Sequence, residues 1–197
     1  NAAGAKIHIQ GRNIHPGYAK DKMINAIQVA FELNSMLPSE QRPEHTEGYE
    51  GFFHQTSISG SVEQCDTDYI IRDHDREKFE QKKDLLRKAV ERLNETYGAG
   101  CVTMELRDQY YNMRQMVEPH MQVIEKALDA MQREGVVPVV RPIRGGTDGS
   151  RLSYMGLPCP NLFTGGMNFH GKYEYCSLDT MTKAMNTIIN LAELWGK

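Results

Sequence analysis

A histidine in a glycine-rich stretch is the first residue of this sequence that could do chemistry. His170 lies in Thr-Gly-Gly-Met-Asn-Phe-His-Gly-Lys-Tyr-Glu, residues 164–174. Its imidazole could bind a metal ion or act as a catalytic base, because histidine is a common metal ligand and a common general base in proteins. Glu174 would share a metal with it only in a helix, which the preceding Gly165 and Gly166 disfavour. The residues alone favour an ordinary loop histidine that bonds to backbone, and they leave the metal ligand open.

A second candidate is the stretch Arg-Gly-Gly-Thr-Asp-Gly-Ser-Arg, residues 144–151. Arg144 or Arg151 could bind a carboxylate through two parallel hydrogen bonds, and the glycines would let a ligand approach the backbone. The spacing alone favours a plain turn from strand to helix, with Asp148 as the N-cap. The Gly-x-Ser-x-Gly pattern of a nucleophile elbow and the Gly-Lys-Ser/Thr pattern of a phosphate loop are both absent.

One further histidine and one cluster of three polar residues each allow a functional and a structural interpretation. His15, in Asn-Ile-His-Pro-Gly, could polarise a substrate carbonyl, but a turn histidine before Pro16 is favoured. Asp73, His74 and Asp75 could form part of a metal cluster. A solvated strand end is the favoured interpretation of these three residues.

The elements of residues 1–113 predict one folding module. Ile7 and Ile9 alternate with polar residues in a strand over 5–10, and a helix is expected over 19–37 with Met23, Ile27 and Phe31 on its apolar face. A hairpin over 51–75 turns near Gly60. The module ends with a charged helix over 75–97 and a strand over 101–112. This order predicts a ferredoxin-like βαββαβ fold, a four-stranded sheet with both helices on one side.

Residues 114–197 show a different pattern of predicted elements. A helix is expected over 117–134, short apolar strands over 136–140 and 160–163, a short helix over 148–156, and a last helix from Ser177. Alternating strands and helices are typical of an α/β fold with a parallel sheet covered on both faces. Two strands are too few for such a sheet, which normally has about four to six. We therefore expect its other strands to come from another chain or from sequence absent here.

Composition narrows the class of protein. A formal net charge of -3 gives no basic surface for a nucleic acid. Four cysteines without a Cys-x-x-Cys pair, together with the lack of a long apolar run, lead us to expect a cytoplasmic protein with free thiols.

Several stretches together resemble the tripeptide aminopeptidases of the aminoacylase and carboxypeptidase G-type family of zinc metallopeptidases. They are NIHPGYAK, TEGYEGFFH, YIIRDHDR, YYNMR and PIRGGTDGSRLSYMGLPCPNLFTGGMNFHGKYEYC, in order along nearly the whole chain. The resemblance implies that residues 1–113 are a lid, or dimerisation, domain. It also implies that residues 114–197 are the C-terminal segment of an incomplete α/β catalytic domain, and that the protein is a homodimer acting on small peptides.

The resemblance also implies roles for five residues. His170 matches the last zinc ligand, and His15 matches a lid histidine that reaches the scissile carbonyl oxygen, often across a dimer interface. Arg72, Asn112 and Arg144 match substrate-binding positions. The family's His-x-Asp motif and its Glu-Glu pair, which hold most ligands of two zinc ions and the general base, are absent from this sequence.

One histidine cannot hold a zinc ion that needs three or four protein ligands. The isolated chain is therefore expected to bind no zinc tightly and to be inactive. The alternative is a non-catalytic dimerisation or interaction module. An RNA-binding sheet is disfavoured by the acidic strand YIIRDHD.

Overall fold

The computed structural model describes residues 1–196. The chain divides into two compact units, and the boundary lies between Tyr111 and Asn112. None of the helices in the described chain is long and apolar enough to cross a lipid bilayer.

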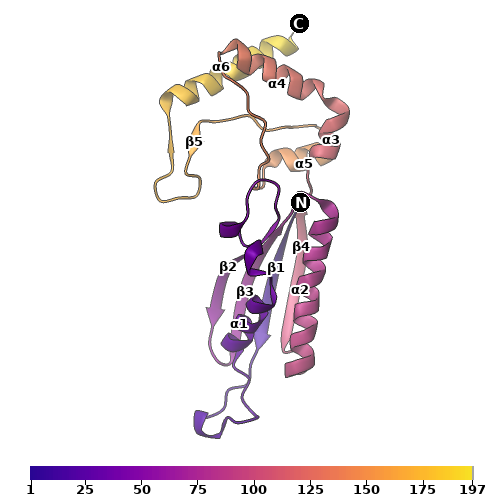
Figure 1. The fold of residues 1–197 in the computed structure, drawn as a ribbon, viewed down its shortest axis with the longest axis vertical. Helices are drawn as coiled ribbons and strands as arrows, with labels where there is room; N and C mark the ends of the chain where they lie inside the picture. The colour runs from indigo at the N-terminus through magenta and orange to yellow at the C-terminus, as the bar shows by residue number, and fades with distance from the viewer. Residues whose placement is uncertain (197) are drawn as a thin grey trace. The chain divides into compact units, whose positions relative to one another are not determined.

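The first unit is built on a four-stranded antiparallel sheet with the strand order β2-β3-β1-β4 (Figure 1). The strands are β1 Ala2–Gln10, β2 Phe52–Gly60, β3 Gln64–Arg72 and β4 Val102–Tyr110. Their order along the chain, with one helix after β1 and one after β3, confirms the predicted ferredoxin-like fold class.

Two helices, α1 Ala26–Met36 and α2 Arg76–Tyr97, pack on the same face of this sheet (Figure 1). Alternate residues of β1 point into the shared core, where Ile7 and Ile9 are almost completely buried. Phe79 and Leu86 of α2 and Leu33 of α1 meet them there. The opposite face is mostly polar and exposed, with Lys6, Asp66 and Glu105 on it, but Ala2 and Phe52 at the Arg72 end of this face are buried. Both helices therefore lie on one side, as the sequence predicts.

The first helix is shorter than predicted. It begins at Ala26 because the Asn25 side chain caps its first turn by accepting a backbone N–H at 3.0 Å. The preceding residues instead form a closed loop, in which Arg12 and Ile24 make an isolated β-bridge. Phe31, predicted on the apolar face, is 56% exposed, because the turn of the helix places it away from the buried stripe.

The second unit is mainly helical. Its helices are α3 Arg114–Val117, α4 Gln122–Arg133, α5 Asp148–Tyr154 and α6 Leu178–Trp195, and its only regular strands within the described residues are β5 Gly166–Met167 and β6 Tyr175–Cys176. The pair α4 and α6 packs together, and Lys126 donates a hydrogen bond to the Leu194 carbonyl at 2.8 Å. The predicted helix over 117–134 is interrupted by a short 3₁₀ turn, Glu118–His120.

The two strands predicted in this unit do not form. In residues 136–140 the side chains of Val137, Val139 and Val140 are 85%, 65% and 77% exposed. A strand needs a neighbour to satisfy its N–H and C=O groups, and within residues 1–196 no strand pairs with this segment or with residues 160–163.

Helix α6 presents two apolar faces. Ala184 and Thr187 are buried in the second unit, on the side that packs with α4. The other face carries Met181, Met185, Ile188 and Ile189, each about half exposed.

Candidate functional site

His15 lies in the loop between β1 and α1. It caps the 3₁₀ turn Pro16–Tyr18, and its Nδ1 accepts the backbone N–H of Gly17 at 3.1 Å. The ring lies beside Tyr18, with 5.4 Å between the ring centroids. Because Nδ1 accepts a hydrogen bond, the neutral ring carries its proton on Nε2. His15 is a turn residue, as favoured above, and it also presents an exposed N–H donor.

Arg72 is the last residue of β3, at the opposite end of the sheet from the His15 loop. The register pairs it with Ala2 of β1 and Phe52 of β2, whereas the far end of the same ladder pairs Gln10 with Gln64. Its guanidinium carbon lies 5.9 Å from the centroid of the Tyr110 ring. The side chain is half-buried on the sheet face that the helices leave uncovered.

The two aspartates after β3 are structural. Asp73 is only 4% exposed, so the predicted solvated strand end is wrong for this residue. Its carboxylate accepts the N–H of Asp75 at 3.0 Å and lies 3.7 Å from the Lys82 ammonium. Burial lowers the pKa of Lys82, although the nearby Asp73 opposes this. Asp75 caps α2 by accepting the N–H of Lys78 at 2.8 Å.

Asn112 begins the second unit and is held from two sides. Its side-chain oxygen accepts the N–H of Arg114 at 3.1 Å, at the start of α3. Its backbone carbonyl accepts a hydrogen bond from the Tyr154 hydroxyl, also at 3.1 Å, and that hydroxyl accepts one from Gln115 at 2.6 Å. These bonds join Asn112 to the end of α5.

Arg144 is half-buried in the irregular segment that leads into α5. The N-cap of that helix is Thr147, so the prediction that Asp148 is the cap is wrong by one residue. A Cβ on Gly149 would collide with the Cys159 carbonyl. The group that lies close to the Gly149 backbone is therefore the Cys159 carbonyl of this chain and not a ligand.

His170 lies in the exposed loop between β5 and β6. Its backbone φ is 63°, in the left-handed region, and its N–H donates to a Glu174 carboxylate oxygen at 2.9 Å. Glu174 thus contacts the backbone of His170 and does not form the helical ligand pair considered above. Spacing did not reveal this contact, although the neighbouring glycines are a sign of unusual backbone angles.

The described residues do not form a complete metal centre. Within residues 1–196, no three His, Cys, Asp or Glu side chains gather closely enough to hold a metal ion. His170 offers one imidazole donor, which suits zinc, but a zinc site needs three or four protein ligands.

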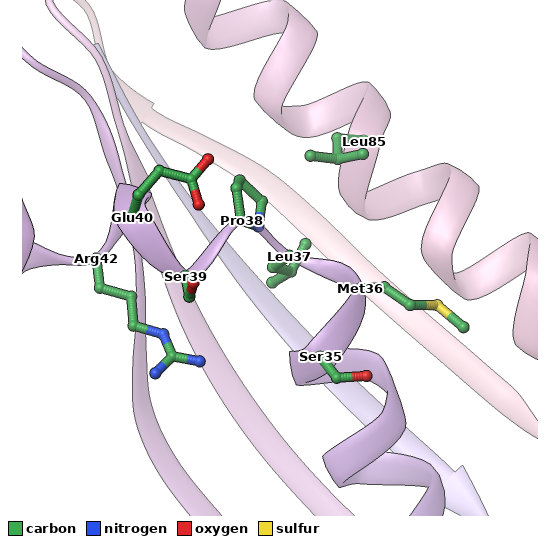
Figure 2. A pocket seen from close by; sticks show the side chains of 8 residues that line it. All are labelled: Ser35, Met36, Leu37, Pro38, Ser39, Glu40, Arg42 and Leu85. Atoms are coloured by element: carbon green, nitrogen blue, oxygen red, sulfur yellow. The ribbon is translucent and has the colours of Figure 1, made fainter.

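A shallow pocket of about 640 Å³ lies between the end of α1 and α2 (Figure 2). Leu37, Pro38 and Leu85 form its apolar part, and Glu40 and Arg42 lie beside them. The five predicted site residues do not line it, so it is separate from the predicted site.

Comparison with curated proteins finds relatives named peptidase T. The chain is 60% identical over 194 residues to the peptidase T of Parabacteroides distasonis, covering 98% of this chain and 48% of that protein. It is 54% identical over 193 residues to the peptidase T of Bacillus subtilis, covering 98% of this chain and 47% of that protein. The chain therefore spans about half the length of the curated relatives it matches.

Solved structures share the fold. The aminopeptidase PepT from Bacillus cereus matches with a TM-score of 0.77 at 20% identity, over 100% of this chain and 52% of that one. A tripeptidase from Staphylococcus aureus matches with a TM-score of 0.75 at 18% identity, over 98% of this chain and 51% of that one.

The family relationship expected from the motifs is confirmed by these relatives. The family model described as "Peptidase dimerisation domain" matches residues 1–101, which is most of the first unit. The chain belongs to the family of peptidase dimerisation domains.

Proposed function

We propose that this chain supplies the lid and the C-terminal part of the catalytic domain of a zinc-dependent aminopeptidase that releases the N-terminal residue of tripeptides. The proposal divides the chain into a lid over 1–113 and a catalytic segment over 114–197. The observation that carries it is the match to proteins named peptidase T along 98% of this chain. The remaining zinc ligands and the general base would come from the half of those proteins that this chain does not match.

His170 would be one ligand of a two-zinc centre. Such a centre would supply an activated water and would polarise the substrate carbonyl. The contribution of this chain is an imidazole held in an exposed loop, and that loop cannot bind zinc tightly by itself. We therefore expect the isolated chain to be inactive.

His15 would donate its Nε2–H to the carbonyl oxygen of the scissile bond. The hydrogen bond from Gly17 to Nδ1 supports this role, because it leaves the proton of the neutral ring on the exposed side. Such a donor stabilises the negative charge that develops on the oxygen during attack.

The remaining three residues would bind the substrate. Arg72 and Arg144 carry guanidinium groups suited to the tripeptide carboxylate, and Asn112 carries an amide suited to a peptide group. Arg72 lies eight residues along β3 from Gln64, at the His15 end of the sheet, which is about 27 Å at about 3.4 Å per residue. An extended tripeptide spans only about 10 Å. One copy cannot place both residues on one tripeptide. The proposed enzyme is therefore a homodimer in which His15 acts on substrate held by the other copy.

The test uses a chimaera in which this chain replaces the matching region of the Parabacteroides distasonis peptidase T. His170→Ala should lower its zinc content, and His15→Ala should lower kcat for a tripeptide much more than it changes folding. The exposed histidines His120 and His45 provide matched control variants. Full zinc occupancy in the His170 variant would show that His170 is not a zinc ligand. Unchanged turnover in the His15 variant would show that His15 does not take part in catalysis.

For the chain on its own we propose a second candidate function, a non-catalytic dimerisation module. The observation that favours it is the self-contained core of the first unit, which the dimerisation model covers. Sedimentation of the purified chain should show a dimer with far less than one zinc per chain. A zinc-loaded chain with peptidase activity would contradict both proposals for the isolated chain.

We also propose a cytoplasmic location for the protein. The four cysteines are free thiols in the structure, which suits a reducing compartment.

A further inference from the structure

His170 occupies a backbone conformation that residues with a Cβ adopt only uncommonly. Its φ of 63° lies in the left-handed region, where a residue with a Cβ is disfavoured relative to glycine. The sequence places glycines at 165, 166 and 171, yet a histidine stands at this strained position. A strained residue in an exposed loop needs neighbours that hold it in place.

Hydrogen bonds within the loop provide that support. The N–H of Gly171 donates to the Asn168 carbonyl at 2.9 Å, which closes a turn with His170 at its third position. The Asn168 side chain donates to the Tyr173 carbonyl at 3.3 Å. The N–H of His170 itself donates to the Glu174 carboxylate at 2.9 Å. Glu174 thus joins the strained residue to the strand β6 that follows.

The surroundings of the loop offer little other support. Residues 167–176 are all exposed, and the Phe169 ring lies against Gly166 at the base of the hairpin. No packed core fixes the angle at His170, so local hydrogen bonds must do so.

We propose that Glu174 is a positioning residue, which holds the His170 backbone in the conformation that presents the imidazole to a metal ion. This inference rests on the proposed ligand role of His170. Glu174 acts on the backbone N–H and not on the metal. Loss of its acceptor would let the peptide rotate to an ordinary negative φ and carry the imidazole away. Ligand positions must be held to within about 0.5 Å for tight binding.

The choice of variant separates a positioning role from a ligand role. Glu174→Gln keeps an oxygen that can accept the His170 N–H but loses the carboxylate that a metal would need. Glu174→Ala loses both. Glu193→Ala, at an exposed glutamate of α6, is the control for a lost surface charge.

The first measurement uses the chain alone and needs no metal. Exchange of the His170 amide with water, followed by NMR, should accelerate about fivefold in Glu174→Ala, the ratio expected for loss of one ordinary hydrogen bond. Glu174→Gln and Glu193→Ala should leave it near the rate of the unchanged chain. An amide that exchanges at the same rate in Glu174→Ala would overturn the inference.

The second measurement uses the chimaera and reads zinc affinity by competition with a chelator. Glu174→Ala should weaken zinc binding by about tenfold, as loss of a residue that orients a ligand does. Glu174→Gln should stay within about threefold of the unchanged protein. A Gln variant as weak as the Ala variant would make Glu174 a direct ligand and refute the positioning role.

The zinc content of His170→Ala distinguishes failure of the proposed ligand role of His170 from failure of the proposed positioning role of Glu174. If it retains all zinc, the ligand role of His170 fails. If it loses zinc while Glu174→Ala keeps full affinity, only the positioning role fails.

Discussion

Lys83→Met should destabilise the first unit by about 2 kcal/mol, because it removes the buried cation that joins α2 to β4. The Lys83 side chain is 5% exposed. Its ammonium donates to Glu80 at 2.8 Å and to both carboxylate oxygens of Asp108, at 2.9 Å and 3.1 Å. Methionine keeps a similar length and apolar stem, so the substitution tests the charge and its hydrogen bonds.

The magnitude follows from how exposed the partners are. Glu80 and Asp108 are 40% and 29% exposed, so water screens part of each attraction. A hydrogen bond to a charged group contributes about 1.5–3 kcal/mol when well formed, and an exposed ion pair about 0–1 kcal/mol. Asp108 also keeps the Tyr111 hydroxyl at 2.8 Å after the substitution. The cost therefore stays below the roughly 3–5 kcal/mol of breaking a fully buried pair.

The pH dependence has a definite sign. Burial opposes ionisation of Asp108, but hydrogen bonds from Lys83 and Tyr111 outweigh it and hold its pKa below the ordinary value of 3.8. Its contribution is present above that value and is lost as pH falls through the lowered pKa. Burial likewise opposes the charge of Lys83, but its bonds to Glu80 and Asp108 raise its pKa above 10.5. That contribution is lost only as pH rises through the raised pKa.

The assay measures the first unit separately from the second. Pulse-labelling hydrogen exchange of β1 peptides along a urea series gives the free energy of unfolding of this unit. Lys88→Met, at an exposed lysine of the same helix, should cost less than about 0.5 kcal/mol. The reasoning would be refuted by a loss for Lys83→Met as small as that of the control. A loss that does not shrink as the pH is lowered through the acid range would refute it as well.

Three further substitutions test the packing of the same unit, each by its urea midpoint under the same labelling. Phe79→Ala should cost about 3–5 kcal/mol, since the ring is fully buried; a smaller loss than Lys83→Met would contradict this. Asn94→Ala should cost about 2 kcal/mol, because its side chain both donates to and accepts from the Val102 backbone at 2.8 Å; an unchanged midpoint would show that water replaces these bonds. Gly51→Ala should cost about 1–3 kcal/mol, because its Cβ would collide with the Asp73 carboxylate and with the Arg72 backbone carbonyl; tolerance would mean that both neighbours can move.

The sequence predicted the elements of the first unit well because they bury their apolar residues within this unit. The alternation of Ile7 and Ile9 reports a face that the unit's own helices cover. The segments over 136–140 and 160–163 have the composition of buried strands but form no strand. Their apolar composition indicates that they tend to be buried, but it does not show whether a neighbouring strand is present to pair with them. The start of α1 was also missed, because it depends on the bridge between Arg12 and Ile24.

The candidate site was predicted less completely. The turn at His15 follows directly from the proline after it. The burial of Asp73 could not be predicted, because it depends on Lys82 and on Gly51, which lie elsewhere along the chain. The bond from His170 to Glu174 depends on a positive φ, which residue spacing does not reveal.

The length of the antiparallel sheet has a genetic consequence. The His15 loop and Arg72 lie at opposite ends of the sheet, one full strand length apart. The proposed roles therefore assign these two residues of one protomer to different active sites. A mixed dimer of His15→Ala and Arg72→Ala protomers would then carry both defects in one site and neither in the other. Two proteins that are each inactive should restore about a quarter of the normal activity when their subunits exchange at random.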